Sequence, residues 1–176
     1  IAILLLTISI IGSTYAFFTA MASSGDSVNT ASTKLEVIYT GDTNINGNID
    51  IVSKKEEGLN RTVNIAVSQD SVEAKGTIYI NIEEISENLR IKGFVWEVYG
   101  VQNGKEVYAK QGDFEGTDDT TNNVIGIVKD YKITKDNTEF TVYFWIDGNQ
   151  TDNKVIGGSF KGYIGAKTEN FTGQIQ

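Results

Sequence analysis

Residues 138–147 read TEFTVYFWID, and their pattern decides the class of fold. Every second side chain along this stretch is apolar: Phe140, Val142, Phe144 and Ile146. A period of two is typical of a β-strand with one buried face, because successive side chains point to opposite sides of a sheet. We therefore expect a strand that turns these side chains toward the core, with Trp145 and Tyr143 on the outward face.

The same alternation recurs in segments closer to the N-terminus. These are KLEVIYT at 34–40, RTVNIAVS at 61–68 and GTIYINIEE at 76–84. The side chains predicted to face inward are Leu35, Val37 and Tyr39, then Val63, Ile65 and Val67, then Ile78, Ile80 and Ile82. Each segment therefore indicates a strand that is buried on one side and solvated on the other.

Changes of chain direction are also visible in the sequence. The apolar phase flips at Gly93, between residues 89–91 and residues 94–98, which predicts a bulge, a bend or a corner between sheets. Trp96 has apolar neighbours and is expected in the core. The sequence NGK at 103–105 favours a tight hairpin turn.

Strand signals at 123–133 and 158–171 complete the pattern, the last with Phe160, Ile164 and Ala166 inward. About eight or nine strands without a convincing amphipathic helix predict an all-β fold over residues 34–176. We expect an antiparallel two-sheet sandwich, either jelly-roll or immunoglobulin-like. The chain contains no proline, a residue that often blocks pairing at sheet edges, so open edges are expected.

The first twenty residues, IAILLLTISIIGSTYAFFTA, carry no charge. Their apolar run has the length of a signal-peptide core and is shorter than the roughly 20 apolar residues of a membrane span. We expect a hydrophobic signal peptide or anchor helix over residues 1–16, and a flexible linker over residues 17–33. Cleavage after Ala16 or after Ala22 satisfies the preference for small residues. A pilin-like filament subunit that keeps its N-terminal helix is the alternative.

The composition argues against several classes of site. The chain has no histidine and no cysteine, which removes imidazole bases, thiol nucleophiles and the usual zinc ligands. A net charge of −8 without a basic cluster argues against nucleic acid as a partner. We therefore expect a protein that is not an enzyme, has no resident cofactor, and meets a membrane through its N-terminal segment alone.

The segment DTNINGNID at 42–50 is the best candidate for a metal site. Its oxygen ligands recur around a glycine with the spacing that opens a calcium loop: Asp42, Asn44, Asn46 and Asp50. The twelfth position, which needs a bidentate acid, holds Ser53. A calcium loop and a plain connection between strands therefore both stay open.

Two further groups of side chains are candidate sites. An exposed Trp145 beside Tyr143 and Tyr163 would form a surface patch for a carbohydrate or another protein. The second group is acidic and is expected to lie in a solvated loop: Asp113, Glu115, Asp118 and Asp119.

Residues 12–19, GSTYAFFT, resemble the G-T-W/Y-A-x-F junction of the TasA/camelysin family of exported Firmicute surface and biofilm-matrix proteins. Residues 29–37 are similar to a second family stretch but lack its glycine and phenylalanine. The C-terminal strands resemble the Y-x-L-x-x-W-I-D … F-x-G-x-I ending of short surface proteins with the same leader. The resemblance implies cleavage after Ala16, a jelly-roll-like sandwich, and fibres in which one subunit's N-terminal segment adds a strand to its neighbour. Phe17, Phe18 and Val28 would belong to that donor segment.

We therefore expect a secreted, extracellular structural protein of the cell surface. It would associate with itself or with related surface proteins, because an extended tail and an open sheet edge are what β-strand addition requires. The alternative is a tethered or secreted binding module that recognises a carbohydrate or depends on calcium.

Overall fold

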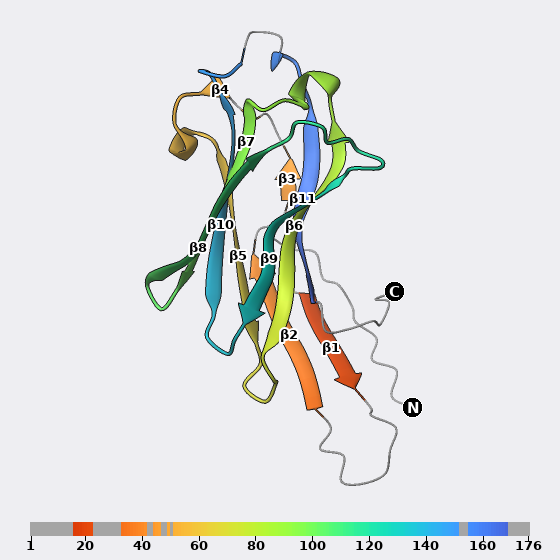
Figure 1. The fold of residues 1–176 in the computed structure, drawn as a ribbon, viewed down its shortest axis with the longest axis vertical. Coiled ribbons are helices and arrows are strands. Elements are labelled where there is room, and N and C mark those ends of the chain that lie inside the picture. Colours follow the sequence, from red (N-terminus) through yellow and green to blue (C-terminus); the bar gives the residue numbers. More distant parts are fainter. Residues whose placement is uncertain are drawn as a thin grey trace.

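Two β-sheets make up most of the described protein (Figure 1). The structure is a computed structural model that describes residues 16–22, 33–41, 44–46, 49, 51–151 and 155–168. The large sheet contains β1 (Ala16–Ala22), β2 (Thr33–Gly41), β4 (Ile51–Val52), β5 (Leu59–Val67), β7 (Phe94–Gln102), β8 (Lys105–Asp113) and β10 (Thr138–Asp147). The small sheet contains β3 (Asn44–Asn46), β6 (Ala74–Ile85), β9 (Val124–Ile133) and β11 (Phe160–Thr168). Two 3₁₀ turns, η1 (Lys55–Glu57) and η2 (Glu87–Leu89), lie between strands.

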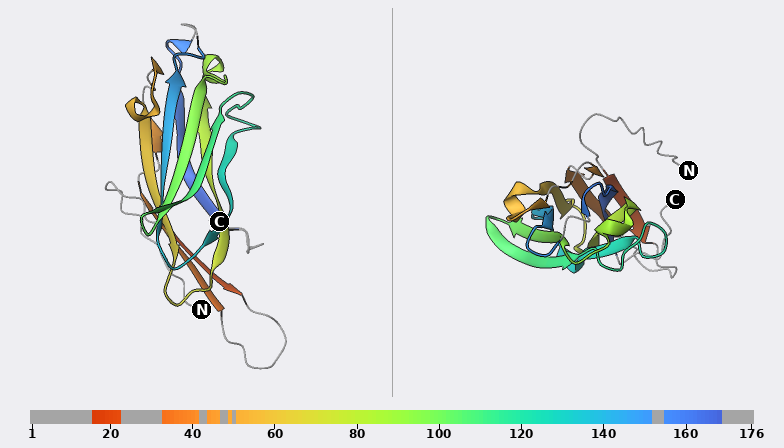
Figure 2. Two further views of the ribbon diagram at one scale, coloured as in Figure 1. Left: turned by 60° about the vertical axis from the view of Figure 1, so that its left-hand side comes forward. Right: turned by 90° about the horizontal axis from the view of Figure 1, so that it is seen from above.

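The sheets face each other as two layers (Figure 2). Strands of the large sheet follow the order β1-β2-β5-β10-β7-β8, with β4 beside the end of β10, and the small sheet follows β3-β11-β6-β9. All pairs described are antiparallel except β4 with β10. The predicted all-β fold with two largely antiparallel sheets is therefore confirmed. Of the predicted leader, residues 1–16, the first fifteen lie outside the described residues, and Ala16 is the first residue of β1.

The core is built from the inward side chains that the alternating pattern predicts. Phe140, Val142 and Phe144 of β10 have no exposed surface. They meet inward residues of the small sheet, of which Ile80 of β6 is likewise fully buried. Trp96 is also in the core, 3 % exposed, as expected. The alternation therefore identifies the buried face of these strands correctly.

The chain crosses between the sheets at Gly41 and near Gly93. Gly41 ends β2 with a φ of 141°, a backbone conformation that side chains disfavour. A Cβ there would overlap the carbonyl oxygen of Thr62. Two residues earlier, the buried Tyr39 hydroxyl donates a 3.1 Å hydrogen bond to the carbonyl of Ile164 in the small sheet. Burial raises the pKa of Tyr39, so this hydroxyl stays a donor.

The phase flip at Gly93 is a corner between sheets, one of the outcomes expected from the sequence. Leu89 belongs to η2, and the chain passes from β6 in the small sheet to β7 in the large one. Ile91 therefore lies in the connection between the sheets and Phe94 begins β7, so the two residues do not belong to one bulged strand. The tight turn at Asn103 and Gly104 is confirmed: both have positive φ, 51° and 74°, and join β7 to β8.

Replacing Gly41 by alanine is expected to lower the free energy of unfolding by about 2–4 kcal/mol, because the new Cβ meets the backbone of Thr62 at an already strained φ. Urea denaturation followed by tryptophan fluorescence measures the loss. Gly104→Ala is the matched control, since it shares the positive φ but has open space around it. Equal losses in the two variants would contradict the role of the close approach to Thr62.

Candidate functional site

The N-terminal strand β1 is the described element that best fits a role in association. Its seven residues pair in register with β2, from Ala16 opposite Tyr39 to Ala22 opposite Thr33. Phe17 and Phe18, expected in a flexible linker or donor segment, therefore lie in a strand of their own chain's sheet. The linker expectation is wrong for residues 17–22, because these residues complete the edge of the large sheet. Val28 lies outside the described residues.

The pairing of β1 extends past the body of the sandwich. The third strand, β5, meets β2 from Val37 to Gly41. The pairs Thr19–Glu36, Ala20–Leu35, Met21–Lys34 and Ala22–Thr33 lie beyond it. Figure 1 shows the ends of β1 and β2 reaching below the other strands. In about half of the hairpin, β1 and β2 therefore pair with each other and with no other described strand.

The edge strands of the two sheets differ in charge. Natural sheets protect their edges with charged side chains, bulges or very short strands. In β8 the charged residues are Lys105, Glu106, Lys110 and Asp113. Charges also occur in β9, whose pairing with β6 contains register shifts, while β3 has three residues. The sequence of β1, AFFTAMA, has no charge. Of the described edges, β1 is thus the least protected against pairing with another strand.

The two predicted calcium ligands that the structure describes lie in a strand and not in a loop. Asn44 and Asn46 lie in β3, an extended strand paired with β11. The guanidinium Nε of Arg61 donates a 2.5 Å hydrogen bond to the carbonyl oxygen of Asn44, so a positive charge lies beside the segment. Asp42 and Asp50 lie outside the described residues. Calcium binding stays a prediction, and the position of Arg61 does not favour it.

The predicted aromatic patch does not form. Tyr143 and Trp145 lie on the outward face of β10, as expected from the register, but Trp145 is 8 % exposed. The chain before β5 covers it: the Cβ of Trp145 is 2.8 Å from where a Cβ of Gly58 would lie. Tyr163 belongs to β11 in the other sheet. The patch expectation is therefore wrong, because the chain at η1 covers Trp145 and because Tyr163 lies in the small sheet.

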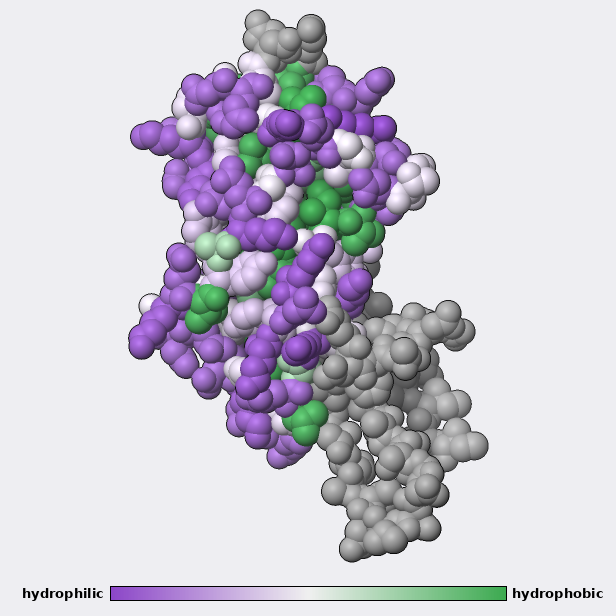
Figure 3. Space-filling view, viewed as in Figure 1, coloured by the Kyte–Doolittle hydropathy of each residue, from purple (hydrophilic) through white to green (hydrophobic). Residues whose placement is uncertain are grey.

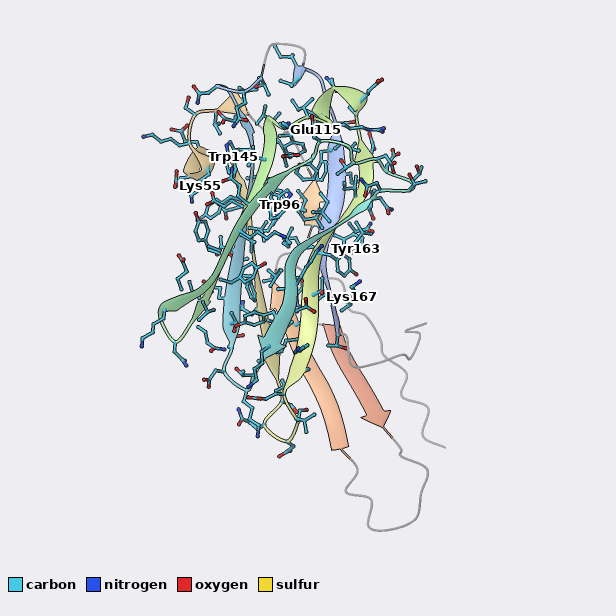
Figure 4. The ribbon with its side chains drawn as sticks, viewed as in Figure 1. Lys55, Trp96, Glu115, Trp145, Tyr163 and Lys167 are labelled. Atoms are coloured by element: carbon cyan, nitrogen blue, oxygen red, sulfur yellow. The ribbon has the colours of Figure 1, made fainter. Side chains whose placement is uncertain are left out.

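Instead, Tyr143 belongs to a cluster around Lys55, a residue that the sequence did not single out. The Lys55 ammonium of η1 lies 4.1 Å from the centre of the Tyr99 ring and 3.1 Å from Glu97 Oε2. It also donates a hydrogen bond to the Tyr99 hydroxyl, which donates to Glu97. The Tyr143 ring packs edge-on against Tyr99 at 6.3 Å. Figure 4 shows Lys55 and Trp145 on the same side of the sandwich.

The Lys55 cluster is an ammonium site that the chain fills itself. Burial would lower the pKa of Lys55, but the hydrogen bonds with Tyr99 and Glu97 outweigh it and raise this pKa. The tyrosine faces and the carboxylate together stabilise the cation. No local sequence motif predicts the cluster, because Lys55 and Tyr99 are far apart in the sequence.

The acidic loop that follows β8 is held by internal contacts. Asp118 accepts hydrogen bonds from the backbone N–H groups of Thr120, Thr121 and Asn122 at 2.7, 2.6 and 2.8 Å. Arg90 lies 3.7 Å from Asp119 and Lys92 lies 3.5 Å from Glu115, on partly exposed surface. Within the described ranges no group of three or more acidic side chains gathers as metal ligands would. The loop is a self-capped turn.

Among the described residues, no helix has the length and apolar character needed to cross a bilayer. Comparison with known proteins adds no assignment: no family model, no curated protein and no solved structure matches this chain. The site residues therefore rest on the geometry described above.

Asp118 makes the stability of the loop depend on pH. The backbone N–H of Asn122, then the Thr121 hydroxyl and the N–H of Thr120, hold the pKa of this carboxyl well below its usual range. Its contribution is therefore complete above the unfolded pKa of about 4 and is lost as the pH falls through the lower folded value.

We expect Asp118→Asn to lose less stability than the unchanged chain when the pH falls from about 5 to about 2, because the asparagine does not titrate. Urea midpoints at several pH values measure the difference. Asp70→Asn, at an exposed turn between β5 and β6, is the matched control, and an equal change there would indicate a general effect of charge. An unchanged pH profile in Asp118→Asn would contradict the role of this carboxylate.

Proposed function

We propose that this chain is an exported, non-enzymatic structural protein of the cell surface whose copies associate by β-strand addition. The observation that carries the proposal is the uncharged edge strand β1, whose pairing with β2 continues past the sandwich. Peptide groups on an open edge bind an extended strand through the backbone, whatever its side chains.

The overhanging ribbon supplies a physical reason for strand exchange. Two strands alone are marginally stable in water, so the half of β1 that lies beyond β5 is held weakly to its own β2 and can leave it. In the proposed contact, β1 of one copy leaves its own β2 and pairs with β2 of the next. Residues 23–32, ten in number, join the two strands and span up to about 33 Å when extended. A contact repeated from copy to copy in this way builds an open filament.

Export and cell-surface location rest on the sequence. The uncharged run at residues 1–20 supports a signal peptide or anchor. The net charge of −8 supports solubility outside the cell, and the lack of histidine and cysteine supports a structural role over catalysis. The TasA/camelysin resemblance points the same way, toward an extracellular matrix fibre.

Within the sandwich, we propose a jelly-roll-like path in preference to an immunoglobulin-like one. The chain changes sheet from β2 to β3, β3 to β4, β5 to β6, β6 to β7, β8 to β9, β9 to β10 and β10 to β11. Repeated crossing between layers supports the Greek-key windings of a jelly roll.

A pair of engineered cysteines tests strand exchange in a chain that has none of its own. Thr19 and Glu36 lie directly opposite each other in the β1–β2 register, at a separation that a disulfide spans. If β1 moves to a neighbour, oxidation of assembled Thr19→Cys/Glu36→Cys protein should give a ladder of covalent oligomers on non-reducing gels. Oxidation of dilute monomer should lock β1 in place and prevent fibres, as seen by negative-stain electron microscopy.

The control pair is Val101→Cys/Glu139→Cys, which lies opposite in the register of β7 and β10 inside the large sheet. It should form a disulfide within one chain in every sample, and the reduced protein should still assemble. Covalent monomers from fibres of the Thr19/Glu36 variant would rule out exchange of β1. Dispersed particles from the unchanged chain at all concentrations would rule out self-assembly.

A further inference from the structure

The outward face of the small sheet carries a hollow of about 330 Å³. It lies over β6, β9 and β11, on the side away from the core. The side chains and backbone that line it include Tyr79, Gly126, Lys129, Asp130 and Lys167. Figure 4 places Lys167 and Tyr163, which lies four residues earlier in β11, on the side of the molecule opposite Lys55. The space-filling view shows a mainly polar surface broken by small apolar areas (Figure 3).

Tyr79 forms the floor of the hollow because its neighbours across the sheet are glycines. In register, Gly165 of β11 and Gly126 of β9 stand on either side of it. The ring lies across Gly165: a Cβ there would be 2.5 Å from the Tyr79 hydroxyl oxygen and would overlap the ring. Tyr79 is half-buried, so part of the ring remains open to solvent. Two glycines thus leave room for a tyrosine that lies along the sheet.

Among the described residues, Lys129 and Lys167 of the hollow have no carboxylate partner like those of neighbouring lysines. On the same sheet, Lys161 pairs with Glu83 at 3.1 Å and Lys132 pairs with Glu73 at 2.5 Å. Lys129 and Lys167 form no ion pair with any residue that the structure describes. The stem of Lys129 lies over Gly126, with its Cε 2.7 Å from where a Cβ would be. In a chain of net charge −8, this leaves two ammonium groups beside one aromatic ring.

We propose that this hollow binds a carboxylated sugar unit of an extracellular polysaccharide. The apolar face of the sugar ring rests on Tyr79, as apolar ligand faces rest on aromatic side chains elsewhere. Lys129 and Lys167 bind the carboxylate through charge-assisted hydrogen bonds. Asp130, exposed beside Lys129, accepts hydrogen bonds from ring hydroxyls. The site lies in the sheet that does not contain β1, so it goes beyond the strand exchange proposed above.

The combination of groups selects this ligand class over a plain anion. A small anion needs the lysines and not the ring, whereas a neutral sugar needs the ring and not the lysines. An acidic sugar uses both, together with the carboxylate of Asp130. Polymers with such units repeat the same group many times, so weak single contacts add up along an assembly.

Titration of the full, ¹⁵N-labelled chain with tetragalacturonic acid, followed by NMR, tests the site. Backbone amide shifts should be confined to the surroundings of Tyr79, Gly126 and Gly165, with a dissociation constant near the millimolar range, about −4 kcal/mol. Lys129→Gln/Lys167→Gln and Tyr79→Ala should each weaken binding by about tenfold or more. Maltotetraose, a neutral sugar, should give much smaller shifts.

The matched control is Lys105→Gln/Lys135→Gln, which removes the same charge from two exposed lysines, one at the start of β8 and one between β9 and β10. It should change the affinity by less than about twofold. Equal weakening in both double variants would overturn the site in favour of general electrostatics. Tyr79→Ala with full affinity, equal binding of maltotetraose, equal binding of a single-stranded oligonucleotide, or no shifts at several millimolar ligand would each overturn the proposal. A dispersed amide spectrum of every variant confirms that it is folded.

Discussion

The burial of one face of β10 is the constraint on which the rest of the structure depends. Its inward side chains, from Phe140 to Ile146, are covered by the small sheet. Its backbone pairs with β7 along one side, and with β5 and then β4 along the other. A strand with one apolar face and two hydrogen-bonding edges can be satisfied only in the interior of a two-layered sheet structure. The other strands of the large sheet add on either side of β10, as far as the edge strands β1 and β8.

The two edge strands of the large sheet, β8 and β1, differ in charge. β8 carries several charges, and its Tyr108 hydroxyl donates a 3.0 Å hydrogen bond to the carbonyl of Ile127 in β9, which partly closes the sandwich on that side. β1 carries no charge and extends with β2 beyond β5. Such an asymmetry is what the proposed assembly at one edge of each subunit requires, because natural sheet proteins usually protect an edge strand with charges.

The polar clusters, in contrast, are assembled by contacts between distant segments and not by local motifs. Lys55 meets Tyr99 because η1 folds back over the outward face of β7 and β10. Tyr79 lies along the small sheet because the strands on both sides place glycines opposite it. Each glycine alone reads as a weak point in a strand. Only together, on neighbouring strands, do they make space for a ring and for the lysine stem beside it.

Local sequence patterns were enough to predict the all-β class, the inward residues of β5, β6 and β10, the core position of Trp96, the hairpin at Asn103 and a break in the strand pattern at Gly93. These features depend on the period of two and on turn chemistry, which act between residues close in the chain. The tertiary structure alone decided that residues 17–22 pair with β2, that η1 covers Trp145, and that Tyr143 and Tyr163 lie on different sheets. Those outcomes depend on which strands become neighbours, and contacts between distant segments leave no periodic trace in the sequence.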